Sequence, residues 1–359
     1  MKYRNDKVAV SIQKYVSDII QFKVKNKDLV LNRILPSYTN LSTHISKLKA
    51  SSQNDKGLCH FAKGQDYYNY LVRSVTSSSR SVKDIKKLIQ TQINSDVLDL
   101  HAALKKCTSS LSETPPITME PSKIIEALKS NICASFPTSA DVNVTVKNVP
   151  AALEEHLSPA FYLIPAIDNY KENVIYINKG YLMDDISLFT TLAHEGYPGH
   201  LYQTTYYQQR NADPLRHLLS FKGYVEGWAT YAEMCSYSLL PLENCHAQLL
   251  QRNSSLLLGL YAMADFGIHY EGWDLPRTTQ FFSGYGIEDS AAIQEIYHLI
   301  LGDPGNYLAY YLGYVEILEL KREMIEKEGA DFSQKGFHEK LLNVGPAPFD
   351  IVRKYVLGT

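Results

Sequence analysis

The spacing of apolar residues predicts α-helices over most of the chain. Residues 81–106 give the clearest early helix, since apolar side chains recur there every three or four positions and Ser81 is placed to cap the first turn. Residues 1–50 show a mixed helical spacing that predicts two or three amphipathic helices with a break at Pro36. The helical pattern resumes after residue 200 and runs to the end. We therefore expect a mainly α-helical protein.

Three short segments between residues 141 and 178 have a different pattern. Val142, Val144 and Val146 alternate with polar residues, as in a half-buried strand, and the apolar runs 160–164 and 174–177 predict two more strands. A small three-stranded β-sheet is therefore expected immediately before the helix that follows. Such a sheet could accept an extended peptide as a further strand, or it could only cover one end of a helical core.

Charge and cysteine content narrow the class of protein. The 36 lysines and arginines are balanced by 38 acidic residues, and a net charge of −2 argues against binding to nucleic acid or to an anionic membrane. The five cysteines are scattered without a CxxC pair, which favours a reduced, intracellular chain. No apolar run is long enough to span a bilayer or to act as a signal peptide. The chain as it stands is expected to be cytoplasmic, with no membrane contact.

The candidate chemistry begins with the sequence His-Glu-Gly-Tyr-Pro-Gly-His at residues 194–200. In zinc hydrolases, two histidines on a helix bind the metal and the glutamate after the first one takes a proton from water. Here the histidines are six residues apart rather than four, roughly 120° around a regular helix. Pro198 and Gly199 lie between them and predict a bulged or broken turn at residues 196–199 that brings His200 back to the ion. The alternative is a capped helix whose histidines make ordinary hydrogen bonds.

A third metal ligand is predicted at Glu226, which lies in the apolar segment at residues 224–233. A carboxylate in such surroundings is costly unless it is paired with a cation. As a ligand, Glu226 would complete the His₂Glu set of one catalytic Zn²⁺ per chain, with one position open for water. Alternatively Glu226 and Glu233, which share a helix face, form salt bridges with a base such as Lys222.

Two later segments could supply further groups. Asp265 and His269 are four residues apart on one helix face, so the pair could orient an imidazole toward an oxyanion or form a rival metal site, although such pairs are more often structural. Tyr310 could stabilise an oxyanion, with Tyr311 beside it as a substrate contact, and Arg322 could bind a substrate carboxylate. Core packing is the more common role for tyrosines on such a helix.

Together these motifs resemble a bacterial family, the domain of unknown function 885, over roughly residues 55–359. HEGYPGH and the EGW triplet at residues 226–228 are the most specific of the matching pieces, which are residues 57–68, 161–164, 174–178, 191–203, 224–233, 268–273, 310–313 and 345–350. That family is similar to helical zinc peptidases of the thimet-oligopeptidase and Taq-carboxypeptidase type. The resemblance implies a helical, zincin-like metallopeptidase architecture, with the small sheet next to the metal-binding helix. It also implies that His194, His200 and Glu226 bind zinc and that Glu195 is the base.

The domain organisation is expected to follow the paired prolines of residues 112–116, which stop a helix and stiffen a linker. Residues 1–115 would form an N-terminal helical region, and residues 116–359 a catalytic helical region containing the sheet, at about residues 141–178, and the metal-binding helices. Members of the family are usually longer at the N-terminus, and many resemble exported proteins. The resemblance therefore implies a truncated N-terminal half, or a partner chain that supplies the missing wall of the cleft.

The leading hypothesis is a zinc-dependent peptidase that hydrolyses short peptides. In it, Glu195 passes a proton from water to the leaving amine, His269 and Tyr310 stabilise the oxyanion, and Arg322 and Tyr311 contact the substrate. The alternatives are a non-catalytic or degenerate peptide-binding protein and another zinc amide hydrolase.

Overall fold

The computed structural model describes residues 2–51, 56–107, 119–139, 141–181, 183–210 and 214–358, and it forms two compact units, Met1–Asp55 and Lys56–Thr359. The first unit contains α1 (Lys2–Leu29), a π-helical turn η1 (Val30–Ile34) and α2 (Leu35–Ser51). The predicted break at Pro36 is wrong, because the helical path continues through it. The N–H of Leu35 donates to the carbonyl of Val30, five residues back. The hydrogen-bond register of the helix thus changes just before Pro36, which has no N–H to donate.

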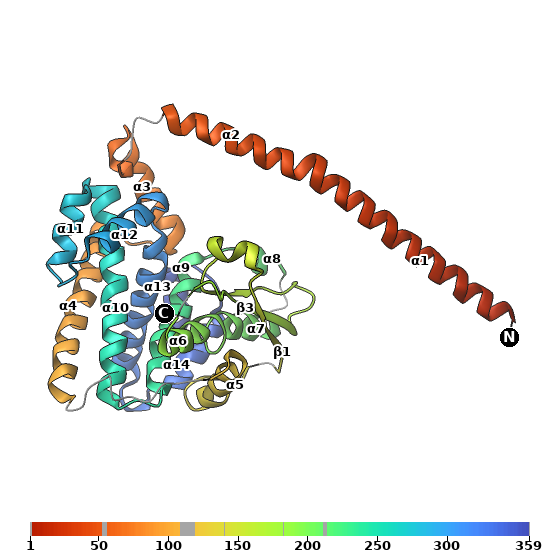
Figure 1. The fold of residues 1–359 in the computed structure, drawn as a ribbon. Coiled ribbons are helices and arrows are strands. Elements are labelled where there is room, and N and C mark those ends of the chain that lie inside the picture. The colour runs from red at the N-terminus through yellow and green to blue at the C-terminus, as the bar shows by residue number, and fades with distance from the viewer. Residues whose placement is uncertain are drawn as a thin grey trace. The chain divides into compact units, whose positions relative to one another are not determined.

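The second unit is organised around long helices that pack side by side: α4 (Val82–Lys106), α9 (Lys222–Ser236), α10 (Asn244–Phe266) and α13 (Asn306–Glu328) (Figure 1). Around them lie α3 (Gly64–Thr76), α5 (Pro121–Asn131), α6 (Asp185–Glu195), α7 (His200–Arg210), α8 (Pro214–Leu218), α11 (Leu275–Ser283), α12 (Ser290–Gly302), α14 (Gln334–Val344) and α15 (Phe349–Leu357). The short helical turns are η2 (Leu58–His60), η4 (Ile132–Ala134), η5 (Ala151–His156), η6 (Tyr237–Leu239), η7 (Gly267–Glu271) and η8 (Gly329–Asp331). The protein is mainly helical, as the apolar spacing predicts.

The two units divide after residue 55. The predicted boundary at the paired prolines of residues 112–116 lies outside the described residues. Helices α3 and α4, which precede that boundary, pack against α13 and α10. The prediction of helix 81–106 itself is confirmed, since Ser81 accepts a hydrogen bond from the N–H of Asp84 at the start of α4.

The three predicted strands are confirmed as β1 (Asn143–Asn148), β2 (Ala160–Leu163) and β3 (Glu172–Ile177). β3 lies in the centre of the sheet, parallel to β1 and antiparallel to β2. β2 therefore forms an edge, and its outward main-chain groups are available to something other than a strand of this sheet. The same strand packs against α6, the helix that carries the first histidine of the motif.

One disulfide, between Cys107 and Cys245, joins the C-terminal end of α4 to the first turn of α10. The expectation of a fully reduced chain is therefore wrong for this pair. Cys59, Cys133 and Cys235 are free. The bridge connects residues 138 positions apart, which is why sequence spacing did not identify it.

Helices α9 and α13 touch through glycines. A Cβ atom on Gly227 would lie 2.4 Å from the carbonyl carbon of Gly313, and one on Gly313 would lie 2.0 Å from the carbonyl oxygen of Gly223. Both distances are far below a van der Waals contact, so any side chain at these positions must push the two helices apart. This contact sets the separation between the helix that carries Glu226 and the helix that carries Tyr310.

We expect Gly227→Ala to lower the free energy of unfolding by about 1–3 kcal/mol, because the added methyl group overpacks the α9–α13 contact. Gly302→Ala is the matched control, since a Cβ there meets nothing within 4 Å and the residue is helical. Urea unfolding followed by circular dichroism measures both. Equal stability of the two variants would contradict the tight contact.

We expect the oxidised protein, unfolded in denaturant, to take up alkylating reagent at three of its five cysteines, and at all five after reduction. Intact mass spectrometry counts the labels. Five labels without reduction would show that Cys107 and Cys245 are not joined.

Candidate metal centre

The helical path is broken between the two motif histidines. α6 ends at Glu195 and α7 begins at His200, with residues 196–199 outside regular helix and a cis peptide bond between Tyr197 and Pro198. The N–H of Gly199 donates to the carbonyl of Ala193 at 2.9 Å, six residues back, in place of a regular helical bond. The predicted break at residues 196–199 is confirmed.

Close packing holds this break in place. A Cβ atom on Gly199 would lie 1.8 Å from the carbonyl oxygen of His194, so only glycine fits there. The indole N–H of Trp228, which is fully buried on α9, donates to the carbonyl of Pro198 at 2.9 Å. The loop is thus tied to the helix that carries Glu226, and the EGW triplet contributes to the site through its tryptophan as well as its glutamate.

The break brings His194, His200 and Glu226 together. The ring centroids of His194 and His200 lie 4.8 Å apart, and the two ring planes are nearly perpendicular, at 82°. Glu226 Oε2 is 3.3 Å from His200 Nε2 and 3.7 Å from His194 Nε2. Two ligands of one tetrahedral zinc ion, each about 2.0–2.2 Å from it, lie about 3.3–3.6 Å apart. The donor spacing therefore fits a single ion held by the three residues.

The state of the Glu226 carboxylate also fits a cation. The side chain is 17% exposed, and its buried Oε2 makes no hydrogen bond of good geometry to any described residue, although both imidazoles are close. Burial alone would raise the pKa of Glu226, but the two histidines hold it well below its ordinary value. Lys222, the alternative partner, instead donates to Asn306 at 2.8 Å. A buried, under-bonded carboxylate oxygen beside two imidazoles is a suitable place for a metal ion.

Glu233 occupies the other side of His194. Its Oε2 lies 3.0 Å from His194 Nδ1, so the imidazole is held between the two glutamates of α9. Burial opposes a charge on His194, but the adjacent carboxylates of Glu226 and Glu233 raise the pKa to about 10. In a metal site, a carboxylate on Nδ1 fixes the tautomer that presents Nε2 to the ion. Glu226 and Glu233 do share one helix face, as their spacing predicts.

Glu195 lies next to these residues but outside the three-ligand group. Its Oε2 accepts a hydrogen bond from the main-chain N–H of Tyr162 at 2.8 Å. Tyr162 is on β2, so the bond ties the edge strand to the end of α6. This contribution of β2 is not visible in the sequence, because a main-chain N–H donor does not depend on the type of side chain.

A cleft of about 500 Å³ runs over these residues. His194, Glu195, His200, Glu226 and Glu233 line its floor, with residues 158–162 and Ile164 along one wall. Tyr310 also lines the cleft, and its ring stacks 6.1 Å from that of His194. Burial and the nearby charges of Glu226 and Glu195 raise the pKa of Tyr310 well above its ordinary value, so the phenol keeps its proton and can donate.

The structure does not bring His269 to this cleft. It is buried in η7, where its Nε2–H donates to the carbonyl of Ile300 at 2.9 Å and its Nδ1 accepts from the N–H of Leu58 at 3.2 Å. Asp265 accepts bonds from Tyr68 and Gly305 instead of orienting His269. Sequence spacing placed this pair on one helix correctly, but both ring nitrogens serve to join segments of the fold.

Tyr311 and Arg322 also lie away from the cleft. One residue along α13 turns the side chain by about 100°, so Tyr311 points into the core and donates to Asp96 at 3.4 Å. Arg322 is twelve residues beyond Tyr310, about 18 Å along the helix, and its exposed side chain pairs with Glu319. The structure therefore does not bring these two predicted substrate contacts to the cleft.

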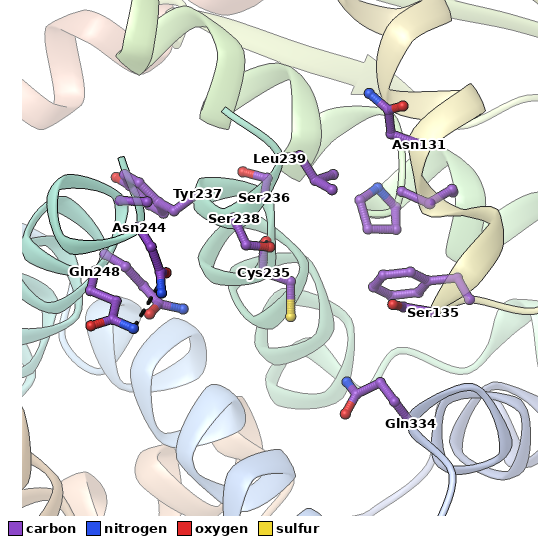
Figure 2. Close-up of a pocket in the computed structure, with 15 residues that line it drawn as sticks. Asn131, Ser135, Cys235, Ser236, Tyr237, Ser238, Leu239, Asn244, Gln248 and Gln334 are labelled. Atoms are coloured by element: carbon purple, nitrogen blue, oxygen red, sulfur yellow. Dashed lines mark hydrogen bonds between the residues drawn. The ribbon is translucent and has the colours of Figure 1, made fainter. Parts of the chain in front are cut away.

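A second cavity, of about 310 Å³, is lined mostly by neutral side chains, among them Asn131, Gln248 and Gln334 (Figure 2). Pro198 of the helix break lines it too, as does Cys235 near the end of α9. None of the described residues that line it carries a carboxylate or an imidazole. Within the described parts of the chain, the other group with metal-ligand spacing is Cys107, Cys245 and His246, where the two sulfurs are joined. The His194 cleft is thus the best candidate centre.

The sequence model of a family described as "Bacterial protein of unknown function (DUF885)" matches residues 6–356. The chain belongs to this family. The match starts well before residue 55, so it extends into the first unit of this DUF885 protein and is wider than the sequence motifs alone indicated.

Two solved structures share the fold. One is titled "putative lipoprotein" from Colwellia psychrerythraea, with a TM-score of 0.75 and 24% identity over 91% of this chain and 60% of that one. The other is titled "putative lipoprotein of unknown function" from Shewanella oneidensis, with a TM-score of 0.66 and 19% identity over 92% of this chain and 65% of that one. This DUF885 protein therefore spans less than two thirds of each relative's length.

No protein with a curated description matches the sequence. Among the helices that the structure describes, none has the length and apolar character needed to cross a membrane.

Proposed function

We propose that this protein is a zinc-dependent peptidase that hydrolyses short peptides. The observation that carries the proposal is the buried Oε2 atom of Glu226, which has no good hydrogen bond to any described residue and lies 3.3 and 3.7 Å from the Nε2 atoms of His200 and His194. His194, His200 and Glu226 would hold one Zn²⁺ per chain, and Glu195 lies beside them in the same cleft without belonging to the ligand group.

Zinc bound by a His₂Glu set polarises a substrate carbonyl and lowers the pKa of a water molecule. The carboxylate of Glu195 takes the proton from the attacking water and returns it to the leaving amine. Tyr310, which remains protonated, donates a hydrogen bond to the oxygen on which negative charge develops. Glu233 orients His194 through Nδ1.

The β-strand that lines the cleft favours a peptide as the substrate. Residues 158–162 line it, and β2 is an edge strand whose outward side faces Glu195. An extended peptide can add to such an edge through main-chain hydrogen bonds, which recognise a backbone without selecting a sequence. A peptide bound in this way would present a scissile amide between Glu195 and Tyr310, which both line the cleft.

We also propose that the protein works in an oxidising compartment rather than in the cytoplasm. The Cys107–Cys245 disulfide supports this location, since reducing conditions keep such pairs open. The two solved structures that share the fold are each described as a "putative lipoprotein". The scattered cysteines that suggested a reduced chain therefore include a pair used for stabilisation.

We expect Glu226→Ala to remove zinc binding, because it deletes a ligand, whereas Glu233→Ala should weaken zinc by about 10- to 100-fold, because it removes only the partner of a ligand. Competition with a chromogenic chelator, together with elemental analysis, gives both affinities. Wild-type protein that takes up no transition metal, or Glu226→Ala with unchanged affinity, would overturn the proposed centre.

We expect Glu195→Gln to keep its zinc and to lower kcat by at least about 10²-fold, since it removes the base but no ligand. The test is digestion of a di- to hexapeptide library by the zinc-loaded protein, read by mass spectrometry, with the variant assayed on the peptides that are cut. If wild-type protein binds these peptides but cuts none, the protein is a peptide-binding module. Cleavage of other amides alone would indicate a different amide hydrolase.

A further inference from the structure

The cleft continues beyond the metal ligands into a second chamber of about 420 Å³. Ile164, Thr204, Val225 and Glu226 line both parts, so the two are contiguous. The chamber is bounded by α7, the residues around α8, and the first turn of α9. None of the mechanism proposed above uses it.

The two parts of the cleft differ in charge. Glu195, Glu226 and Glu233 line the metal part, whereas Arg216, His217 and Lys222 line the chamber. Among the described residues that line the chamber, Glu226 at the boundary is the one carboxylate. Neither Arg216 nor Lys222 makes a salt bridge with a described carboxylate. Arg216 donates to the main-chain carbonyls of Val344 and Pro346, each at 3.0 Å, and Lys222 donates to the Asn306 amide. Both cations are held in place by neutral acceptors, so their charge is available to an anion.

A buried donor points to the same kind of ligand. Gln203 is 3% exposed and lines the chamber, and its Nε2 has no hydrogen-bond acceptor among the described residues. Leaving a buried N–H group without an acceptor is costly, and a ligand oxygen would remove that cost. The chamber thus offers two cations and an unused amide donor.

The distance from the reacting atoms is short. Lys222 and Asn306 precede Glu226 and Tyr310 by four residues on α9 and α13, so the Lys222–Asn306 pair lies one helical turn, about 6 Å, from the catalytic layer. An extended peptide advances at most about 3.6 Å per residue. A carboxylate one or two residues from the scissile bond therefore reaches this pair.

We propose that the Arg216–Lys222 chamber binds a substrate carboxylate one or two residues from the scissile bond, which makes the protein selective for peptides cut close to a carboxylate. The inference rests on the proposed peptidase function. The carboxylate comes either from the free C-terminus of a short peptide or from an acidic side chain. In this proposal Arg216 and Lys222, on α8 and α9, bind the carboxylate that the sequence pattern assigns to Arg322.

Binding to the zinc-loaded Glu195→Gln protein tests the chamber without turnover. Isothermal titration with tetra-alanine, with its C-terminal amide, and with Ala-Ala-Ala-Asp amide compares the two sources of the carboxylate. We expect the free acid to bind roughly 10- to 100-fold more tightly than the simple amide. If the aspartyl amide equals the free acid, side-chain carboxylates are accepted as well; if it equals the simple amide, only a chain terminus is recognised.

Lys222→Met and Arg216→Met, each combined with Glu195→Gln, should reduce this preference to a few-fold or less while leaving affinity for the amide and zinc content unchanged. Lys222→Arg should retain it. Lys335→Met is the matched control, because this exposed lysine also donates to a carbonyl but lies outside the cleft. Equal affinity for acid and amide, or an unaltered preference in both chamber variants, would overturn the inference. If wild-type protein hydrolyses peptides but the acid and the amide bind equally well, only the proposal for the chamber fails. If the preference for the acid is intact but wild-type protein cuts no peptide, only the proposed peptidase function fails.

Discussion

The candidate centre of this protein depends on one half-buried carboxylate, that of Glu226, whose Oε2 atom is buried beside two imidazoles. Keeping an ionised carboxylate out of water is costly, so the surrounding residues must supply compensating positive charge or a cation. His194 and His200 occupy the two positions close enough to do so. The broken turn at residues 196–199, the Trp228 bond to Pro198, and the glycine contact between α9 and α13 all serve to hold these three groups at their spacing.

The sequence predicted much of this arrangement because local chemistry determines it. Strand β1 follows from the alternation of its apolar side chains, and β2 and β3 follow from short apolar runs. Helix α4 follows from its apolar spacing and its Ser81 cap. The break at residues 196–199 follows from a proline and a glycine placed between histidines that a regular helix would separate. The association of Glu226 with the histidines was foreseen from the cost of its apolar surroundings.

Other parts could not be predicted, because they depend on contacts between distant segments. His269 and Asp265 have the spacing of a functional pair, yet Leu58, Ile300, Tyr68 and Gly305 occupy their polar atoms. Arg216 and Lys222 carry no recognisable motif, and their importance depends on where α8 and α9 meet α7. Cys107 and Cys245 are close only because α4 and α10 pack against each other. In each case, the role of the residue depends on the residues that it contacts in the folded protein.

The bond between Glu195 and the Tyr162 N–H has a further consequence for how such an enzyme would position its base. A carboxylate has two oxygens, so Glu195 Oε1 can receive a proton from water while Oε2 accepts the N–H. The bond therefore need not break for the base to act. It would instead fix the base relative to the edge strand that a peptide would join, so that one stretch of main chain would align both the substrate and the group that acts on it.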